Sequence, residues 1–201
     1  MGPIAVLAAV AGRLNRQAGA GALPALWLFT DPQRLPDPYA AAALLPPGAA
    51  VVYRHFGARD RDDKARALAE LCRRRGLKLL IGSDPDLARA VGADGVHWPE
   101  RLVKRRARIF RLETGAAHGR EGLAKAAKAG LDACVLGPVF VSRSASAGPL
   151  APPWGPLRAG ALARAAGLPV IALGGVKAQN AARLIGRGFA GLAAIDGLRG
   201  D

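Results

Sequence analysis

Short apolar runs recur along the chain, and glycine, proline or polar residues bound each of them. Runs of this kind are typical of strands buried on both faces, as in a parallel sheet. Between the runs, apolar residues follow the spacing of an amphipathic helix, as in the stripe of Ala65, Leu68, Ala69 and Cys72. The pattern predicts strands at 25–30, 50–54, 78–81, a very short one ending at residue 97, 108–112, 133–136, and two that begin at residues 170 and 191.

Helices are expected in most of the intervening segments, at 3–16, 38–45, about 62–75, a short stretch after residue 85, 119–129, 157–166 and 178–187. Alternating strands and helices predict an α/β fold: a single (βα)8 TIM barrel over residues 25–201, after an N-terminal helix and linker in residues 1–24. Few residues follow the last strand, so we expect a truncated last helix, with the N-terminal helix covering the wall it leaves open. The alternative is a doubly wound open sheet, but no Gly-x-Gly-x-x-Gly follows the first strand.

The first apolar stretch has a competing interpretation as a signal peptide, because Ala18-Gly19-Ala20 resembles a cleavage site. No Lys or Arg precedes that stretch, however, and Arg13 and Arg16 interrupt its end. We therefore favour a helix, in which the two arginines lie near the C-terminus where the macrodipole favours cations.

Composition narrows the function classes. The 201 residues carry a net charge of +14, yet the basic residues are spread over many expected helices and no nucleic-acid-binding motif occurs. We interpret the densest group (Arg101, Lys104, Arg105, Arg106 and Arg108) as a solvated helix face. No apolar run is long enough to span a bilayer, and the two cysteines are expected to be reduced packing residues. The sequence thus predicts a cytoplasmic protein with no nucleic-acid or membrane partner, and it leaves a homodimer open.

Three consecutive strands lead into loops that contain glycine, at residues 133–146, 170–176 and 191–197. The first of these loops carries Ser142, Arg143, Ser144 and Ser146. Hydroxyls, a guanidinium and free backbone N–H groups suit an anion, most plausibly a phosphate. The last loops of a (βα)8 barrel often bind phosphate, which raises this interpretation above that of a solvated serine-rich turn.

All three histidines of the chain (His55, His97 and His118) fall at or just after the end of an expected strand. Chemistry in a barrel takes place at these ends, although a lone histidine there is more often structural than catalytic. His118 is the best candidate proton carrier, because it lies in a loop and imidazole titrates near neutrality. Arg54 can bind phosphate or pyrophosphate through two hydrogen bonds, or it can pair with Asp31 or Glu100.

The order of these motifs resembles the thiamine phosphate synthase and TenI-type thiazole tautomerase family over about residues 25 to 198. The matching segments are Thr30-Asp31, Val51-Val-Tyr-Arg54, Gly92-Ala-Asp-Gly-Val-His97, His118, Leu136-Gly-Pro-Val-Phe140 with Ser142 and Ser144, Pro169-Val-Ile-Ala-Leu-Gly-Gly175, and Ala194-Ile195.

This resemblance implies one of two reactions. The synthases join a pyrimidine pyrophosphate to a thiazole phosphate with the help of Mg²⁺, whereas the tautomerases aromatise a thiazole phosphate carboxylate by proton transfer without a metal. In both, the thiazole phosphate would rest on Ser142, Ser144 and the N–H groups of Gly174, Gly175 and Gly197. The candidate binding residues are Ser142, Ser144, Gly174, Gly175, Asp196, Gly197, Thr30, His97 and Glu100, and the candidate catalytic residues are His118 and Arg54.

The sequence also departs from the synthase pattern. Around the second strand, Val52 stands in place of its Gln and Phe56 in place of its Lys. Gly82-Ser83 replaces its Asn-Asp, Glu100 its second Gln, and Leu102 its second metal-binding Asp. Thr114 and Ala116 replace the Gly and Ser before the motif histidine, and Ala145 replaces its later Lys. No cofactor is implied with certainty: no metal ligand is assigned, although Mg²⁺ stays open with Asp84 as at most a displaced ligand. Three hypotheses follow: a thiamine phosphate synthase-like transferase, a metal-free thiazole phosphate tautomerase that uses His118, or a non-catalytic binder of phosphorylated ligands.

Overall fold

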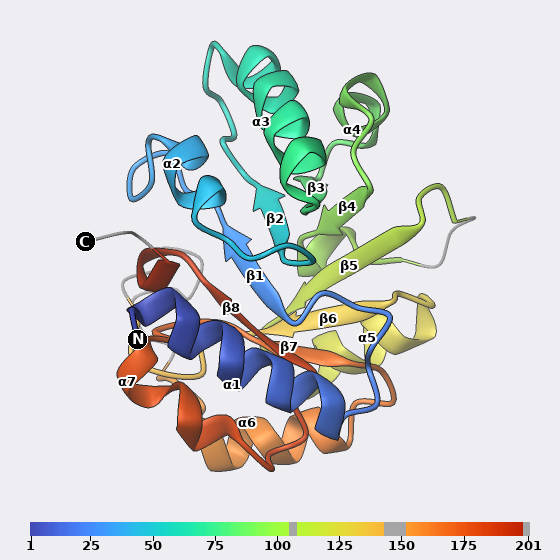
Figure 1. The fold of residues 1–201 in the computed structure, drawn as a ribbon. Coiled ribbons are helices and arrows are strands. Elements are labelled where there is room, and N and C mark those ends of the chain that lie inside the picture. Colours follow the sequence, from blue (N-terminus) through green and yellow to red (C-terminus); the bar gives the residue numbers. More distant parts are fainter. Residues whose placement is uncertain (105–107, 143–151, 199–201) are drawn as a thin grey trace.

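The computed structural model describes residues 1–104, 108–142 and 152–198. Within these ranges, parallel strands pair in sequence order and close into an eight-stranded barrel (Figure 1). The predicted TIM-barrel fold is therefore confirmed. The strands are β1 (Leu26–Phe29), β2 (Ala50–Tyr53), β3 (Lys78–Gly82), β4 (Gly95–Trp98), β5 (Leu112–Ala117), β6 (Ala133–Leu136), β7 (Val170–Ala172) and β8 (Gly191–Ala194).

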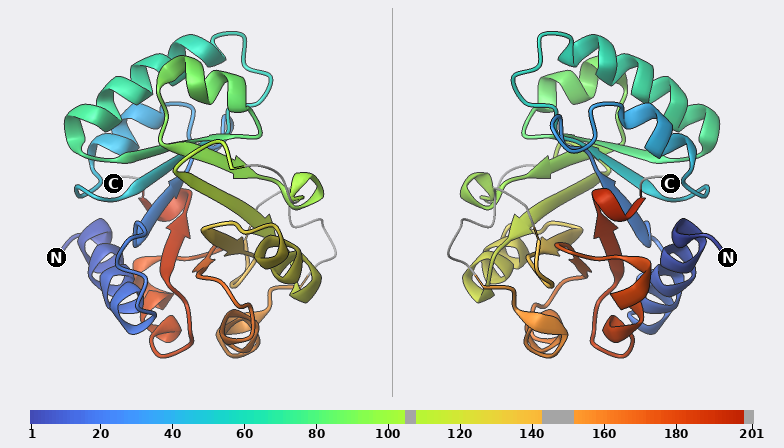
Figure 2. Two further views of the ribbon diagram at one scale, coloured as in Figure 1. Left: turned by 90° about the vertical axis from the view of Figure 1, so that its right-hand side faces the viewer. Right: turned by 90° about the vertical axis from the view of Figure 1, so that its left-hand side faces the viewer.

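Helices surround the barrel on its outside (Figure 2). They are α1 (Pro3–Gln17), α2 (Pro38–Ala43), α3 (Arg61–Arg75), α4 (Pro85–Val91), α5 (Arg120–Lys128), α6 (Gly155–Arg164) and α7 (Ala178–Ala181), with 3-10 turns η1 (Glu100–Leu102), η3 (Ala182–Leu184) and η4 (Asp196–Leu198). The single helix expected at 178–187 is thus wrong in detail, since α7 tightens into η3. After β8 the described chain forms only the turn η4, as expected for a truncated last helix.

Alternation along the strands creates two apolar cores. One side of the strands points into the barrel, with Trp27, Val52 and Leu80 in its filling. The other side packs under the helices, for example at Leu28 and Val51. Because successive side chains of a strand point to opposite faces, every strand residue is buried on one side or the other, apart from the first residue of β3 and Ala116 in β5.

The fifth strand differs from its prediction. It was expected at 108–112, but β5 begins at Leu112 and continues to Ala117. The sequence pattern does not indicate this strand, because the small residues Gly115 and Ala116 form no apolar run. Ile109 and Phe110, which precede the strand, form an apolar run, which explains the predicted position. The shift places Thr114 inside the strand and makes His118 the first residue after it.

The N-terminal segment is a helix, as predicted, and it closes the wall beside the last strand. In α1, Leu7, Ala11 and Leu14 are buried, and the helix packs against β1, β8, α7 and η4 (Figure 1). The side chain of Asn15 donates to the backbone carbonyls of Ala20, Leu23 and Ala190, which ties the segment to the barrel. The boundary drawn between residues 24 and 25 stays a prediction.

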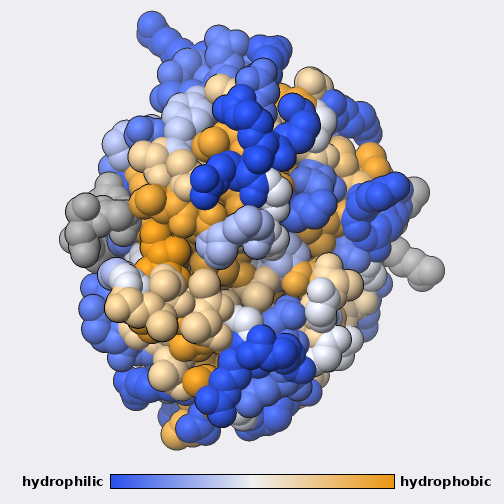
Figure 3. Space-filling model, in the orientation of Figure 1, coloured by the Kyte–Doolittle hydropathy of each residue, from blue (hydrophilic) through white to orange (hydrophobic). Residues whose placement is uncertain are grey.

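The surface mixes polar and apolar residues on the face seen in Figure 3. The densest basic group was wrongly predicted to be a helix face: of its described members, Arg101 lies in the short 3-10 turn η1, and Lys104 and Arg108 lie in no helix. Arg108 pairs with Asp132, while Arg105 and Arg106 lie outside the described residues. No helix within the described ranges combines the length and hydrophobicity needed to cross a membrane. Cys72 and Cys134 are buried free thiols, as predicted.

Candidate active site

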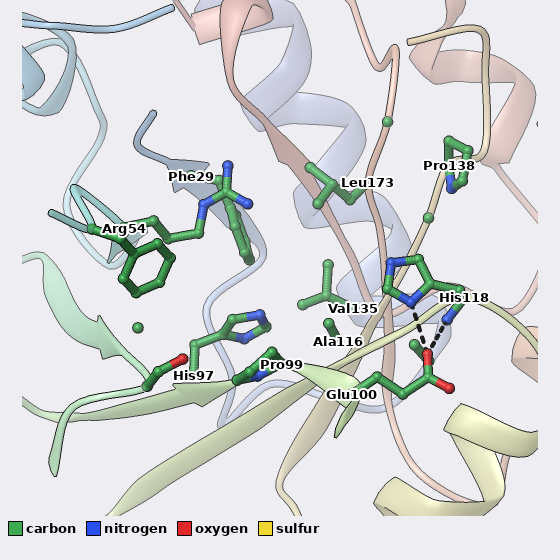
Figure 4. Close-up of a pocket in the computed structure, with 16 residues that line it drawn as sticks. Phe29, Arg54, His97, Pro99, Glu100, Ala116, His118, Val135, Pro138 and Leu173 are labelled. Atoms are coloured by element: carbon green, nitrogen blue, oxygen red, sulfur yellow. Dashed lines mark hydrogen bonds and ion pairs between the residues drawn. The ribbon is translucent and has the colours of Figure 1, made fainter. Parts of the chain in front are cut away.

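A cavity of about 220 Å³ opens at the C-terminal ends of β1 to β7. Successive side chains of a strand point alternately into the barrel and out of it. The inward-pointing residues at the ends of neighbouring strands therefore line one common space. Figure 4 places Arg54 and His97 on one side of this cavity, His118 and Glu100 on the other, and Ala116 and Val135 between them. The other lining residues are Phe29, Phe56, Gly82, Ser83, Pro99, Ala117, Gly137, Pro138, Leu173 and Gly174. We call this space the cavity.

Arg54 follows β2 and projects inward over the ring of Phe29, with 5.2 Å between its guanidinium carbon and the ring centroid. Its backbone N–H donates to the hydroxyl of Thr30 over 2.8 Å, and its Nε donates to the Thr30 carbonyl over 3.0 Å. Burial lowers the pKa of Arg54, while the charge of Asp31 opposes the shift. Thr30 itself is fully buried and orients Arg54, so its predicted contact with substrate stays a prediction.

His97 forms part of the cavity beneath Arg54 (Figure 4). Its Nδ1 lies 2.9 Å from Oγ1 of the buried Thr114, and the ring packs edge-on against Phe29. Burial, assisted by the positive charge of Arg54, lowers the pKa of His97 to about 3. The ring is therefore neutral at physiological pH, so it can exchange hydrogen bonds with a ligand but carries no charge to attract one.

Phe56 and Gly82 meet at one edge of the cavity. A Cβ on Gly82 would lie 2.9 Å from the ring of Phe56, so the ring occupies space that a larger residue at position 82 would need. Arg61 lies over the outer face of the same ring, 5.8 Å from its centroid. An aromatic ring therefore lines this edge of the cavity.

Asp84, the candidate metal ligand, is already engaged. Its Oδ1 accepts the backbone N–H of Leu87 and so caps α4, while its Oδ2 forms an ion pair with Arg61. Although burial works against it, these hydrogen bonds lower the pKa of the Asp84 carboxyl. Among the described residues, no group of three or more His, Cys, Asp or Glu side chains has a geometry suited to a metal ion.

His118 lies on the opposite side, and two residues hold its backbone. Oε2 of Glu100 accepts its backbone N–H over 2.8 Å and also lies 2.8 Å from its ring Nδ1. The indole Nε1 of Trp154 donates to the His118 carbonyl over 3.0 Å. Sequence reasoning missed Trp154, which precedes α6 and is far from His118 along the chain; no local pattern could have found it.

A second hollow of about 220 Å³ lies beside the cavity, between the loops that follow β6, β7 and β8. We call it the cradle. It contains five of the predicted binding residues, Ser142, Gly174, Gly175, Asp196 and Gly197, whereas His97 and Glu100 line the cavity instead and Thr30 lines neither. Ser144 lies outside the described residues.

Close packing explains the glycines of the cradle. Gly174 and Gly175 have φ angles of +97° and +62°, a region that favours glycine. A Cβ on Gly175 would lie 2.2 Å from the carbonyl oxygen of Val141, and one on Gly197 would lie 2.6 Å from that of Val176. The cradle is thus built from backbone, which suits an anion bound through N–H groups.

Charged side chains also line the cradle. Arg34, from the loop after β1, forms an ion pair with the carboxylate of Asp196, and Lys177 precedes α7. A carboxylate repels phosphate, so Asp196 can assist a phosphate only by holding Arg34 in place. Arg34 and Lys177 were not among the sequence candidates, because neither lies at a strand end nor in a glycine motif.

The third histidine does not belong to the site. His55 directly follows Arg54, so its side chain points to the outer face of the barrel, away from the cavity. It is buried there and stacks on Tyr53 with 5.0 Å between ring centroids. Its Nε2 has no hydrogen-bond partner among the residues that the structure describes. Burial lowers the pKa of His55, so the buried ring stays neutral.

The family model described as thiamine monophosphate synthase matches residues 27–198. A putative thiamine-phosphate synthase of Geobacter sulfurreducens is 36% identical over 155 residues, covering 71% of this chain and 72% of the relative. The thiamine-phosphate synthase of Alcanivorax borkumensis is 34% identical and covers 89% and 87%. A solved thiamine phosphate pyrophosphorylase from Pyrococcus furiosus superposes with a TM-score of 0.70 at 25% identity, over 85% of this chain and 84% of that structure.

Proposed function

The chain belongs to the thiamine monophosphate synthase family of thiamine biosynthesis, and we propose that it is a transferase that couples a pyrimidine pyrophosphate to a thiazole phosphate held in the cradle. The observation that carries this proposal is the meeting of Gly174, Gly175 and Gly197 around one hollow next to the cavity. The phosphate would accept hydrogen bonds from backbone N–H groups there, and the ring would lie in the adjoining apolar cavity. We expect the enzyme to act in the cytoplasm.

Arg54 would bind the negatively charged leaving group. It is the guanidinium that lines the cavity, and it is oriented by Thr30 on one side and Phe29 beneath it. A planar guanidinium can bind two oxygens of a pyrophosphate at once. The net charge of +14 adds a long-range attraction for anionic substrates.

We further propose that the magnesium-binding half of the family's site is degenerate in this chain. Mg²⁺ prefers oxygen ligands such as carboxylates, yet Asp84 caps α4 and pairs with Arg61, and Glu100 accepts from His118. Phe56 packs into the space beside Gly82, where the synthase pattern has a lysine and an Asn-Asp pair. These carboxylates and their surroundings do not fit Mg²⁺. The activation free energy of coupling should therefore be several kcal/mol higher than in a relative that has all the metal-binding and phosphate-binding residues.

The geometry of His118 supports a second candidate, a metal-free thiazole phosphate tautomerase. One ring nitrogen contacts Glu100, and Figure 4 shows the other side of the ring turned away from Glu100, toward the cavity. A histidine with one anchored and one available nitrogen can take a proton from a bound ring at one carbon and return it at another. The apolar walls would keep competing water away from that ring.

One set of assays separates these candidates. The protein is incubated with a pyrimidine pyrophosphate, a thiazole phosphate and Mg²⁺, and in parallel with a thiazole phosphate carboxylate tautomer alone. Formation of thiamine phosphate supports the transferase, whereas metal-independent aromatisation supports the tautomerase. Tight thiazole phosphate binding by calorimetry with neither product would contradict both and favour the non-catalytic binder.

The role of His118 has its own test in whichever assay shows turnover. Replacing His118 by Gln removes the group that moves the proton, so turnover should fall by about 10²- to 10⁴-fold. Thiazole phosphate affinity should stay within about twofold, since the cradle is untouched. Full activity in His118→Gln would rule the role out.

A further inference from the structure

We propose that Glu100 is a positioning residue, which fixes the ring of His118 so that Nδ1 carries a proton and Nε2 addresses the cavity. This inference rests on the proposed acid-base role of His118. It assigns Glu100 a task other than the substrate contact predicted from the sequence. The bond that defines it is the 2.8 Å contact between Oε2 of Glu100 and Nδ1 of His118.

A carboxylate can only accept hydrogen bonds when it is ionised, so its partner nitrogen must carry the hydrogen. The neutral ring then has its lone pair on Nε2, on the side away from Glu100 (Figure 4). During turnover Nε2 would take a proton from one carbon of the bound thiazole ring and return it at another. Nδ1–H would stay hydrogen-bonded to Glu100. The carboxylate remains ionised throughout and stabilises the imidazolium that forms in between.

The contact is more than an exposed ion pair between mobile side chains. The same Oε2 accepts the backbone N–H of His118, and Trp154 donates to the His118 carbonyl. The main chain of His118 is therefore held from two sides, and the ring is held by a third bond. Lys125 also donates to the backbone carbonyl of Glu100, over 3.2 Å, and links it to α5.

Gly122 makes the room that Glu100 needs. A Cβ at this position of α5 would lie 2.7 Å from the carboxyl carbon of Glu100 and 2.8 Å from both of its oxygens. The residue is helical and its φ is ordinary, so backbone conformation does not require glycine there. The absence of a side chain at position 122 is explained by the carboxylate that rests against it.

This packing yields an unusual test variant. Alanine in a helix interior is normally favoured over glycine by about 1 kcal/mol. Gly122→Ala should therefore keep α5 intact and remove no polar group, yet the carboxylate of Glu100 must shift from its present position, which we expect to weaken its contact with the ring. Glu100→Ala removes the same contact directly. Gly12→Ala in α1, where only the flexible end of Arg16 lies within 4 Å, and Glu121→Gln, an exposed acid in the same turn of α5, are the matched controls.

The first readout is the tautomer of the His118 ring, measured by nitrogen NMR on the ligand-free protein. The chain has three histidines, and the His118 signals are those that vanish in His118→Gln. We expect the Nδ1–H form in the natural sequence and in both controls. Glu100→Ala and Gly122→Ala should both shift the ring toward the Nε2–H form.

The second readout is steady-state kinetics with the substrate that shows turnover. Loss of a residue that orients another typically costs 10- to 100-fold, so kcat should fall by about that factor in Glu100→Ala and Gly122→Ala. KM should change by less than about twofold, because neither variant alters the cradle or Arg54. Both controls should keep the kinetics of the natural sequence.

An unchanged His118 tautomer in both Glu100→Ala and Gly122→Ala would overturn the inference, even if the enzyme proved fully active. A shifted tautomer with unchanged kcat would overturn it as well, since the orientation would then not matter. If the natural sequence turns over no thiazole phosphate substrate, the proposed function fails, but the ring measurement still decides whether Glu100 sets the tautomer.

Discussion

The cavity and the cradle lie side by side at the same end of the barrel, yet they are built by opposite means. Side chains form the cavity: Arg54, His97 and His118 project from strand ends among aromatic and aliphatic walls. In the cradle, glycines bring the main chains of neighbouring loops into contact. The two share Leu173 and Gly174 at their common border.

This difference bears on how the site can diverge. A backbone cradle depends on loop conformation, so one added methyl group at a glycine can destroy it. A side-chain cavity can change its chemistry one residue at a time while the barrel stays intact. We propose that this chain follows that contrast: it has the glycine loops, but Phe56 and Gly82-Ser83 stand where the family resemblance would place a lysine and an Asn-Asp pair.

The largest expected effect tests the cradle. In Gly175→Ala a Cβ would lie 2.2 Å from the carbonyl of Val141, and the φ of +62° is unfavourable for alanine by about 1–2 kcal/mol. The loops must move apart, so the Kd for thiazole phosphate should rise by about 100-fold in calorimetry, which is about 2.7 kcal/mol.

Gly48→Ala is the control for this variant. Its φ of +81° imposes similar strain, but no atom lies within 4 Å of the added Cβ, and the position is remote from the cradle. Gly48→Ala should lower the free energy of unfolding but leave the Kd for thiazole phosphate unchanged. Equal affinities in the two variants would mean that the cradle does not bind the phosphate.

The next effect concerns the buried ring in the cavity wall. Burial and Arg54 lower the pKa of His97 to about 3, below the usual 6.5, so the unfolded chain binds the additional proton between these two values. Stability should therefore fall as the pH falls below about 6.5. The loss attributable to His97 is about 2 kcal/mol between pH 7 and pH 5.

Urea unfolding at several pH values measures this effect. His97→Asn should reduce the loss of stability between pH 7 and pH 5 by about 2 kcal/mol, whatever its stability at pH 7. Between pH 7 and pH 8 the two proteins should show the same slope, because the histidine is neutral in both states. Parallel curves down to pH 5 would contradict a neutral, buried His97.

The smallest effect tests a cavity wall. Phe56 is 54% exposed, so Phe56→Ala should cost less than about 1 kcal/mol of stability. Loss of the ring should weaken thiazole phosphate binding by about three- to fivefold, because one apolar contact disappears. Leu157→Ala, at an exposed apolar residue on α6, is the control and should leave affinity unchanged. Equal affinity in both variants would remove Phe56 from the site.

The sequence by itself determined the barrel and predicted where on it the chemistry would lie. Apolar runs bounded by turn residues specify parallel strands, since a strand buried on both faces needs apolar side chains on both. Glycine-containing loops after the last three strands indicated the cradle, and the strand-end rule found Arg54, His97, Glu100 and His118. These features are local or follow from a general property of the fold.

Tertiary structure alone decided which of these residues lie together. The position of β5 depended on Gly115 and Ala116, whose small side chains give no apolar signal, so only pairing with β4 and β6 revealed the strand. The alternation of side chains along the chain then places Arg54 in the cavity and His55 on the opposite, outer face of β2. The contacts of Glu100 with His118 and of Arg34 with Asp196 join residues 18 and 162 positions apart, and no local pattern encodes a contact that closure of the barrel creates.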